Sequence, residues 1–344
     1  MEIKVKKIKT TDIGSVGLSP ISLAWNKLSR VSGATMSLWI RRRGSIQPFA
    51  RSVLPCVMIP TILRSPSKPP LGKYRNNSAQ KNNAPGNELH AKDYLIYAYL
   101  QGGQDREAKR ALEAPPAGRP DDPQYMNWLY AMGTSPARYA VERHRWDEAA
   151  ALPVPPNTFP GGRWAWTEAN LHFARALGAS RTGKTEAARE DLQQLASLRD
   201  TLTLGNDKYW ADQVDIQRES AAAWIMVAEG KGEEALRQMR SAAEHEDKTD
   251  KNNVTPGVIV PARELLGEML LELKQPAQAM VEFEATLRTA PNRFNALSGA
   301  ARAAKLSGDN EKAKTYYARL LSICAHADGD RPELQDARSL LAQK

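Results

Sequence analysis

The fold is decided by the stretch Arg263-Glu-Leu-Leu-Gly-Glu-Met-Leu270, followed by Ala279-Met-Val-Glu-Phe283 and closed by Pro291. In each of the first two segments the apolar residues recur at three- or four-residue spacing, which places them on one face of a helix. Proline cannot continue the hydrogen-bond ladder of a helix, so Pro291 ends the second one. The stretch therefore predicts two antiparallel helices joined by a tight turn.

The same pattern returns 34 residues further on, where Ala279 becomes Ala313 and Phe283 becomes Tyr317. Two helices of about a dozen residues and two short turns use about 34 residues. The alanine lets the second helix approach the first closely, and the aromatic ring one turn later fills the gap between hairpins. The period thus predicts an array of stacked helical hairpins.

Earlier hairpins are indicated by a glycine followed five residues later by an alanine. This spacing occurs at four places: Gly103 to Ala108, Gly183 to Ala188, Gly230 to Ala235 and Gly308 to Ala313. The segment from Arg145 to Ala149 is a variant without the glycine. We predict about six hairpins, the first four with longer loops, and a capping helix from Pro332 to Gln343 with Asp330 as its N-cap.

The chain lacks the alternating β-branched runs that are typical of strands. The predicted fold class is therefore all-α, a right-handed α-solenoid of helical hairpins.

Several segments resemble a group of bacterial tetratricopeptide (TPR) repeat proteins of unassigned function, over about three quarters of the chain. They are His90-Ala-Lys-Asp-Tyr-Leu-Ile-Tyr-Ala-Tyr-Leu100, Tyr209-Trp-Ala-Asp-Gln-Val-Asp-Ile-Gln217, Val254-Thr-Pro-Gly257, Pro261-Ala-Arg-Glu-Leu-Leu-Gly267 and Pro291-Asn-Arg-Phe294. The resemblance implies a TPR-like repeat domain over residues 87–344. Relatives of this kind carry further repeats upstream, so the resemblance also implies that upstream repeats are missing here.

Residues 1–86 form a leader of different character. Residues 1–85 contain 15 Lys and Arg against Glu2 and Asp12, a charge of +13, so the total of +9 leaves −4 for the rest. The repeat domain has no basic excess to attract phosphates, and we predict that it does not bind nucleic acid. A Pro-, Ser- and Asn-rich stretch from Ser65 to Gly86 predicts a disordered linker.

The chain shows no transmembrane segment, because no apolar run approaches about 20 residues. The run from Ser52 to Leu63 has the length of a signal-peptide core, but Pro55 and Pro60 break it and no cleavage site follows. We predict a cytoplasmic protein, with export through the segment 36–64 as the alternative. Cys56 and Cys324 are too few for a disulfide framework, which agrees with a reducing compartment.

The segment Gly178-Ala-Ser-Arg-Thr-Gly-Lys-Thr185 matches the phosphate-binding P-loop letter by letter. That motif requires a strand before the glycine-rich loop, whereas residues 164–177 carry apolar side chains at helical spacing. Gly183 is also in phase with the turn glycines of the other hairpins. We predict a hairpin turn, and a nucleotide-binding enzyme that uses Gly178 to Thr185 is a remote alternative.

No catalytic residue, cofactor or metal is predicted. The five histidines lack the spacing of a zinc site on a helix. The acidic clusters Glu244-His-Glu-Asp247 and His326-Ala-Asp-Gly-Asp330 are interpreted as polar helix ends.

The binding surface is predicted on the concave face, which the first helix of each hairpin lines. Helical phase directs six side chains into this groove: Tyr97, Phe173, Trp224, Glu264, Glu268 and Arg302. The same register adds His90, Asp93, Asn170, Leu177, Gln217, Ser220 and Ser298. TPR domains that capture a carboxylate use Lys and Asn at such sites, so this groove suits an apolar or basic peptide. The alternative is that the aromatic side chains pack between hairpins.

The predicted function is therefore a non-catalytic scaffold that binds a protein or peptide, with self-association left open. The alternative is a truncated fragment of a larger helical-repeat protein without independent activity.

Overall fold

The computed structural model describes residues 40–42, 45–47, 85–114, 125–156, 158–250 and 257–343. The chain divides into two units, Met1–Leu54 and Pro55–Lys344. In the first unit, the strands β1 (Ile40–Arg42) and β2 (Ser45–Gln47) pair antiparallel, with Ile40 opposite Gln47. Residues 85 and 86, at the end of the leader, belong to the first described helix of the second unit. The other leader residues, including the apolar run from Ser52 to Leu63, lie outside the described residues, so the predictions of disorder and export remain predictions.

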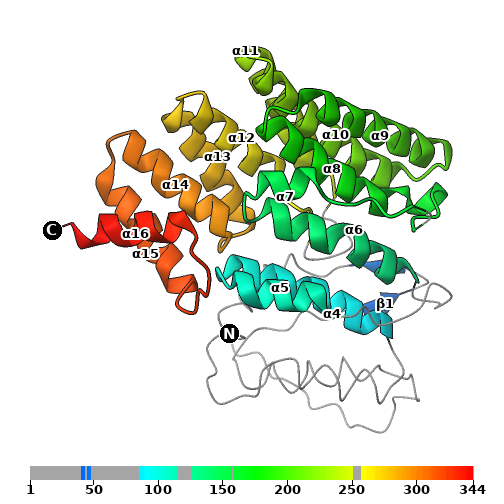
Figure 1. Cartoon of the computed structure of the whole chain (residues 1–344), viewed down its shortest axis with the longest axis horizontal. Helices are drawn as coiled ribbons and strands as arrows, with labels where there is room; N and C mark the ends of the chain where they lie inside the picture. The colour runs from blue at the N-terminus through cyan, green and yellow to red at the C-terminus, as the bar shows by residue number, and fades with distance from the viewer. Residues whose placement is uncertain are drawn as a thin grey trace, which may run out of the picture. The chain divides into compact units, whose positions relative to one another are not determined.

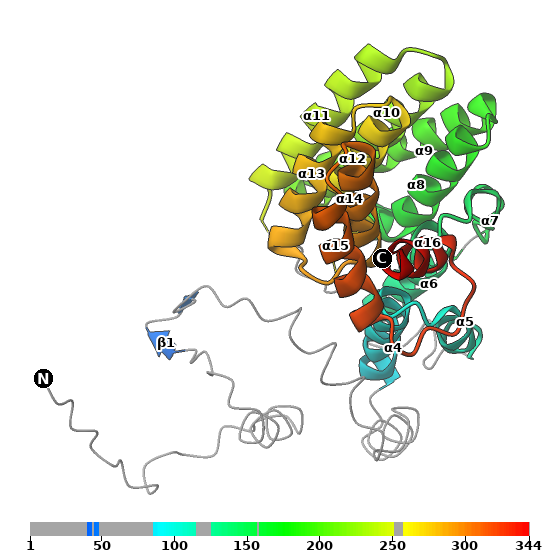
Figure 2. The same cartoon turned by 90° about the vertical axis from the view of Figure 1, so that its left-hand side faces the viewer.

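The described part of the second unit consists of successive helix pairs and a final single helix (Figure 1 and Figure 2). The pairs are α4 (Pro85–Gln101) with α5 (Asp105–Glu113), α6 (Tyr125–Val141) with α7 (Trp146–Ala150), α8 (Ala165–Arg181) with α9 (Thr185–Leu204), α10 (Lys208–Ala228) with α11 (Gly232–Lys248), α12 (Ala262–Glu272) with α13 (Pro276–Thr289), and α14 (Phe294–Leu306) with α15 (Asn310–Ile323). A 3₁₀ turn, η1 (Gly162–Trp164), precedes α8, and α16 (Pro332–Ala342) is last. The unit is an all-α helical-repeat solenoid, which confirms the predicted fold class.

The hairpin turns show why glycine recurs in them. Gly103, Gly183, Gly230 and Gly308 have φ between 67° and 85°, the left-handed conformation that ends a helix and that glycine adopts without strain. His144 takes the same conformation with φ of 51° in the turn between α6 and α7. The hairpin without a glycine therefore keeps the turn geometry.

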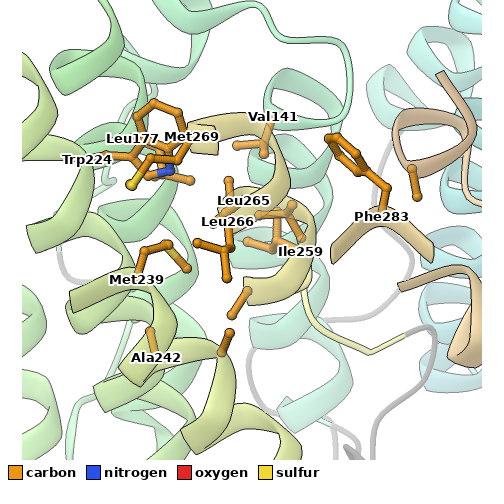
Figure 3. Packing of buried hydrophobic residues seen from close by; sticks show 14 of the residues in the cluster. Val141, Leu177, Trp224, Met239, Ala242, Ile259, Leu265, Leu266, Met269 and Phe283 are labelled. Atoms are coloured by element: carbon orange, nitrogen blue, oxygen red, sulfur yellow. The ribbon is translucent and has the colours of Figure 1, made fainter. Parts of the chain in front are cut away.

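The last two complete hairpins pack as their 34-residue period predicts. Phe283 is buried between α12 and α14 (Figure 3). Each of these two helices has a glycine facing the ring, and only glycine leaves enough room for it. A Cβ atom on Gly267 would lie 2.9 Å from the ring of Phe283, and one on Gly299 would lie 2.4 Å from it. Ala279 is fully buried as well, so the small residue and the aromatic have the predicted roles.

The predicted N-cap of the last helix is wrong. The N-cap of α16 is Arg331, whose side chain makes no capping hydrogen bond, and the predicted cap Asp330 lies one residue earlier. The side chain of Arg331 instead reaches the first hairpin, where its Nη2 lies 2.6 Å from Oδ1 of Asp105. Pro332 stands at the first position of the helix, where its missing N–H costs nothing, and the Arg331 side chain serves a tertiary ion pair and not a cap.

The first and last hairpins of this unit are in contact. The loop before α16 caps α5, because the carboxylate of Asp328 accepts hydrogen bonds from the backbone N–H groups of Arg106 (2.9 Å) and Glu107 (3.1 Å). The N–H of Asp328 also donates to the carbonyl of Gly103 (3.3 Å). The array therefore curves until its two ends meet.

Candidate functional site

The inner face of the solenoid is occupied by a central ion-pair network of Asp93, Arg138, Glu142, Glu264 and Arg293. Arg293 binds Glu142 (Nη2 to Oε1, 2.9 Å) and Glu264 (Nε to Oε2, 2.7 Å). Nε of Arg138 lies 3.4 Å from Oδ1 of Asp93. All five side chains are buried, so each charge depends on its partner for the solvation that it loses. The network ties α4 and α6 to α12 and to the turn before α14.

A second group of polar contacts continues this interior towards α8 and α10. Nε2 of His144 lies 3.0 Å from Oε1 of Glu268, and Nη1 of Arg181 lies 3.7 Å from Oε2 of the same carboxylate. The guanidinium of Arg181 stacks over the ring of Trp224 at 4.0 Å. Burial lowers the pKa of His144, but the carboxylates of Glu268 and Glu333 outweigh it and raise the pKa above its usual value.

The structure corrects the expectation that the predicted groove residues line an open surface. Phe173, Trp224 and Glu264 are 3%, 1% and 0% exposed, and in Figure 3 Trp224 lies with Leu177 and Met269. Among the other predicted residues, Arg302 is exposed, and three are half-buried: Tyr97, Gln217 and Glu268. Five are buried: Asp93, Asn170, Leu177, Ser220 and Ser298. The side chain of His90 lies outside the described part of the structure. Neighbouring hairpins cover Trp224, because Leu177 lies on α8 and Met269 on α12, and Glu264 is covered by its ion pair with Arg293. A role of these residues in peptide binding remains a prediction.

A non-helical segment of the chain itself, Gly257–Val260, lies on the inner face. Its carbonyl groups accept hydrogen bonds from Arg138, whose Nη2 lies 3.0 Å from O of Gly257 and whose Nη1 lies 3.1 Å from O of Val258. The hydroxyl of Tyr130 donates to the carbonyl of Gly257 at 3.4 Å. Ile259 and Val260 are buried in the main core. Donors on α6 therefore hold a stretch of irregular backbone against the inner face.

Beside this segment is a cavity that we call the inner cavity. Aromatic rings from three helices form much of its wall: Tyr130 from α6, Trp166 and Phe173 from α8, and Trp210 from α10. The rings of Trp166 and Trp210 stack with centroids 3.6 Å apart and planes 4° apart. The atom-free space is about 540 Å³ including the open mouth, but only about 30 Å³ of it admits the centre of a water molecule. The cavity is therefore narrow, with room for two or three waters.

The polar side of the inner cavity comes from α8 and α10. Nε2 of Gln217 donates to Oδ1 of Asn170 (2.9 Å), and Nδ2 of Asn170 donates to the hydroxyl of Thr134 (3.0 Å). The buried Oε1 of Gln217 and the indole N–H of Trp166 have no hydrogen-bond partner among the described residues. Buried polar atoms without a partner are rare in folded proteins and call for a ligand or ordered water.

Glu246, at the end of α11, also lines the inner cavity. Its Oε2 accepts a hydrogen bond from the N–H of Ala262 (2.8 Å) and so caps α12. Glu246 forms no ion pair with any residue that the structure describes. Burial raises the pKa of its carboxyl to about 7. The sequence assigned Glu246 to a helix end, which is where it lies, but gave no sign that it caps a different helix beside a cavity.

The remaining candidates from the sequence are structural. Gly178 to Arg181 end α8, Thr185 begins α9, and no strand precedes them, so the P-loop geometry is absent from this fully described segment. A Cβ atom on Gly178 would lie 2.4 Å from the backbone nitrogen of Ala150, so this glycine allows α7 to pack closely. In the two acidic clusters, Asp247 pairs with Arg263 and Asp328 caps α5.

Among the described residues, Asp215, Glu219 and His245 offer three atoms close enough together to hold a metal ion. Asp215 already binds Arg218 (2.7 Å) and Arg199 (3.1 Å) through the same oxygen. Its charge is therefore compensated by the protein itself. No helix in the described part of the chain is both long and apolar enough to span a bilayer.

No protein-family model matches the chain, and no curated protein matches it. Among solved structures, the crystal structure of the P58(IPK) TPR domain is similar over 80% of this chain and 83% of that one. The two are 19% identical and superpose with a TM-score of 0.31. A similarity of this size adds no argument about function, and the fold assignment rests on the hairpins themselves.

Proposed function

We propose that this protein is a non-catalytic scaffold that binds an extended peptide segment of a partner protein at the mouth of the inner cavity. The supporting observation is that Gly257–Val260 already lies on the same face, with its carbonyl groups bound by Arg138 and Tyr130. For a second, adjacent segment the lining offers two polar atoms without a partner among the described residues, Oε1 of Gln217 and the indole N–H of Trp166. Aromatic rings in the cavity wall are typical anchors for such peptides.

The chemistry of the inner face favours a peptide that does not bind through its C-terminal carboxylate. The inner arginines are already paired: Arg138 with Asp93, Arg181 with Glu268, and Arg293 with Glu142 and Glu264. A bound carboxylate would have to displace one of these carboxylates from a buried site, which is costly. The partner segment therefore engages the cavity through its side chains.

The non-catalytic assignment is supported by the lining of the inner cavity. Glu246 is its single carboxyl, and no histidine, cysteine or lysine is among the described residues that line it. Ser220 has no neighbouring base in this lining to activate its hydroxyl. The cavity thus offers contacts for binding but no pair of groups for acid–base or nucleophilic chemistry.

A peptide selection with the full chain tests this function. A random peptide library displayed on phage is enriched on the immobilised protein, and the affinity of the enriched peptides is measured by fluorescence anisotropy. Gln217→Trp puts a larger side chain in the lining of the inner cavity and should weaken binding at least tenfold, or about 1.4 kcal/mol. Lys305→Ala, an exposed change on α14 outside the predicted groove, should leave the affinity unchanged.

Hydrogen exchange gives a readout that does not depend on the variant. Bound peptide should slow exchange in α6, α8, α10 and the segment from Gly257 to Val260. Protection confined to other helices, or equal affinity for the wild type and the Gln217→Trp protein, would show that the inner cavity is not the binding site. Failure to enrich any peptide would count against the function itself.

A further inference from the structure

We propose that the inner cavity takes the ammonium group of a lysine side chain from the bound peptide. This inference rests on the proposed function and specifies the chemistry of its ligand. Three features of the inner cavity support it: its aromatic walls, the carboxyl group of Glu246, which has no cation as a partner among the described residues, and its narrowness.

The aromatic walls suit a cation. Tyr130, Trp166, Phe173 and Trp210 all line the inner cavity, and the negative face of such rings attracts a desolvated cation. The same interior already holds a cation in this way, because Arg181 lies 4.8 Å from the ring of Trp146 and 4.0 Å from the ring of Trp224. The inner cavity repeats this arrangement without a cation of its own among the described residues.

Glu246 is an exception among the carboxylates of the inner face. Asp93, Glu142, Glu264 and Glu268 each lie within ion-pair distance of an arginine or a histidine. Glu246 has only the N–H group of Ala262 as its partner among the described residues. A ligand cation would supply the charge that each of the other inner carboxylates receives from the protein.

The charged groups around Glu246 do not take the place of a paired cation. Asp247 on the same helix disfavours the ionised carboxyl, while Arg293 and Arg263 favour it from a distance. Burial outweighs both arginines, and the pKa of Glu246 therefore stays raised, at about 7. A cation in the inner cavity would lower that pKa and bind best to the ionised carboxylate.

The size of the cavity fits a compact cation. Room for two or three waters is enough for an ammonium group, which is a small point charge. The atom-free space of about 540 Å³ includes open solvent at the mouth, so the cavity can be reached from outside. A lysine side chain carries such a small charged end on a slender apolar stem.

The test uses n-butylammonium as the probe, because it reproduces the end of a lysine side chain without a peptide. Binding to the full chain is measured by isothermal titration calorimetry, with n-butanol as the neutral analogue. We expect binding of butylammonium at pH 8, at least tenfold weaker binding at pH 5.5, and no binding of butanol. The probe stays protonated at both pH values, so the change reports on Glu246.

Two variants on α11 locate the effect. Glu246→Gln keeps an oxygen for the N–H group of Ala262 but removes the charge, and it should weaken butylammonium binding at least tenfold and abolish its pH dependence. Glu244→Gln, an exposed change two residues away, should bind like the wild type. Melting curves establish that both variants fold.

The outcomes separate this inference from the proposed function. Equal binding of butanol, equal binding by the Glu246→Gln protein, or no binding of butylammonium at pH 8 would overturn the lysine pocket. If the selected peptides lack lysine but lose affinity with Gln217→Trp, the scaffold function stands and the lysine pocket falls. If butylammonium binds through Glu246 but no peptide is selected, the pocket stands and the scaffold function falls.

Discussion

Arg293 shows how a single residue organises the interior. It follows the turn after α13 and has contacts with Glu142, in the turn after α6, and with Glu264, on α12. A buried guanidinium keeps its charge only when carboxylates replace the lost water. One side chain thereby joins segments about 150 residues apart in the sequence.

Removal of one partner of Arg293 should be strongly destabilising. Glu264→Ala leaves the guanidinium with one carboxylate and creates a small void, so we expect the free energy of unfolding to fall by about 3–5 kcal/mol. Urea denaturation followed by circular dichroism measures the change. Glu272→Ala, an exposed change on the same helix, should alter stability by less than about 1 kcal/mol. Similar losses in the two variants would contradict the assignment of Glu264 to the central network.

At the scale of the element, the hairpins are shaped by close approach. The ring of Phe283 lies against Gly267 on α12 and Gly299 on α14, and the backbone of α7 lies against Gly178 on α8. A side chain on any of these glycines would overlap a neighbour. Glycine is present in these helices for its size, although it lowers helix stability by about 1 kcal/mol relative to alanine.

The contact between Phe283 and Gly299 can be tested with a double-mutant cycle. Gly299→Ala places a methyl group 2.4 Å from the ring, and we expect a loss of about 1–3 kcal/mol of stability. Phe283→Leu makes room for that methyl group, so the two losses should not add. The free energies of unfolding of the two single variants and the double variant give the coupling. Simple additivity would mean that the ring and the glycine do not constrain each other.

The segment from Gly178 to Thr185 offers a second test at this scale. Gly178→Ala should lower stability by about 1–3 kcal/mol because the methyl group meets the backbone of α7. Gly205→Ala is the control, since its Cβ would meet only ordinary contacts at a negative φ. ATP at millimolar concentration with magnesium should leave the melting temperature of the wild type unchanged. A clear rise would revive the nucleotide-binding alternative.

At the scale of the whole helical unit, the decisive feature is the contact between its first and last hairpins. Asp105 on α5 binds Arg331, and the loop before α16 caps α5 through Asp328. His144 adds a link between the turn after α6 and two later helices, through Glu268 on α12 and Glu333 on α16 (3.9 Å). Contacts of this range make the array one cooperative structure, in contrast to an open stack in which each repeat contacts only its neighbours.

The link through His144 predicts a pH dependence. Its pKa is raised in the fold by Glu268 and Glu333 against the opposing effects of burial and Arg181. The stabilisation of the fold by protonated His144 is therefore fully present below about pH 6.5, the pKa of histidine in the unfolded chain. It is lost as the pH rises through the higher pKa of His144 in the folded protein. The pKa of Glu268 is lowered despite its burial, so its part of the stabilisation is lost only in acid.

His144→Asn tests this link, because asparagine tolerates the positive φ at this position. The variant should be less stable than the wild type near pH 6, and the difference should shrink towards pH 9. Denaturant unfolding across this range gives the profile. His326→Asn, an exposed change in the loop before α16, should show no such trend. A difference independent of pH would assign His144 a packing role only.

Local patterns in the sequence were sufficient for the helices and turns. The apolar spacing of Leu266, Leu270, Ala279 and Phe283, and the glycines at the hairpin turns, act over fewer than about 34 residues, and their geometry follows from helix periodicity and from left-handed backbone. The all-α hairpin array, the roles of Ala279 and Phe283, and the turn at Gly183 could therefore be predicted.

The tertiary structure alone decided what covers the inner face. Helical phase directed Phe173, Trp224 and Glu264 inward, but phase does not say whether that face meets solvent or another helix. The answer depends on curvature, which accumulates over all the hairpins and brings Asp105 to Arg331 and Glu142 to Arg293. The pairing of Glu142 with Arg293 follows from this closure, and the inner cavity with Glu246 follows from the packing of α6, α8 and α10 against the segment 257–260. No short-range pattern in the sequence encodes either.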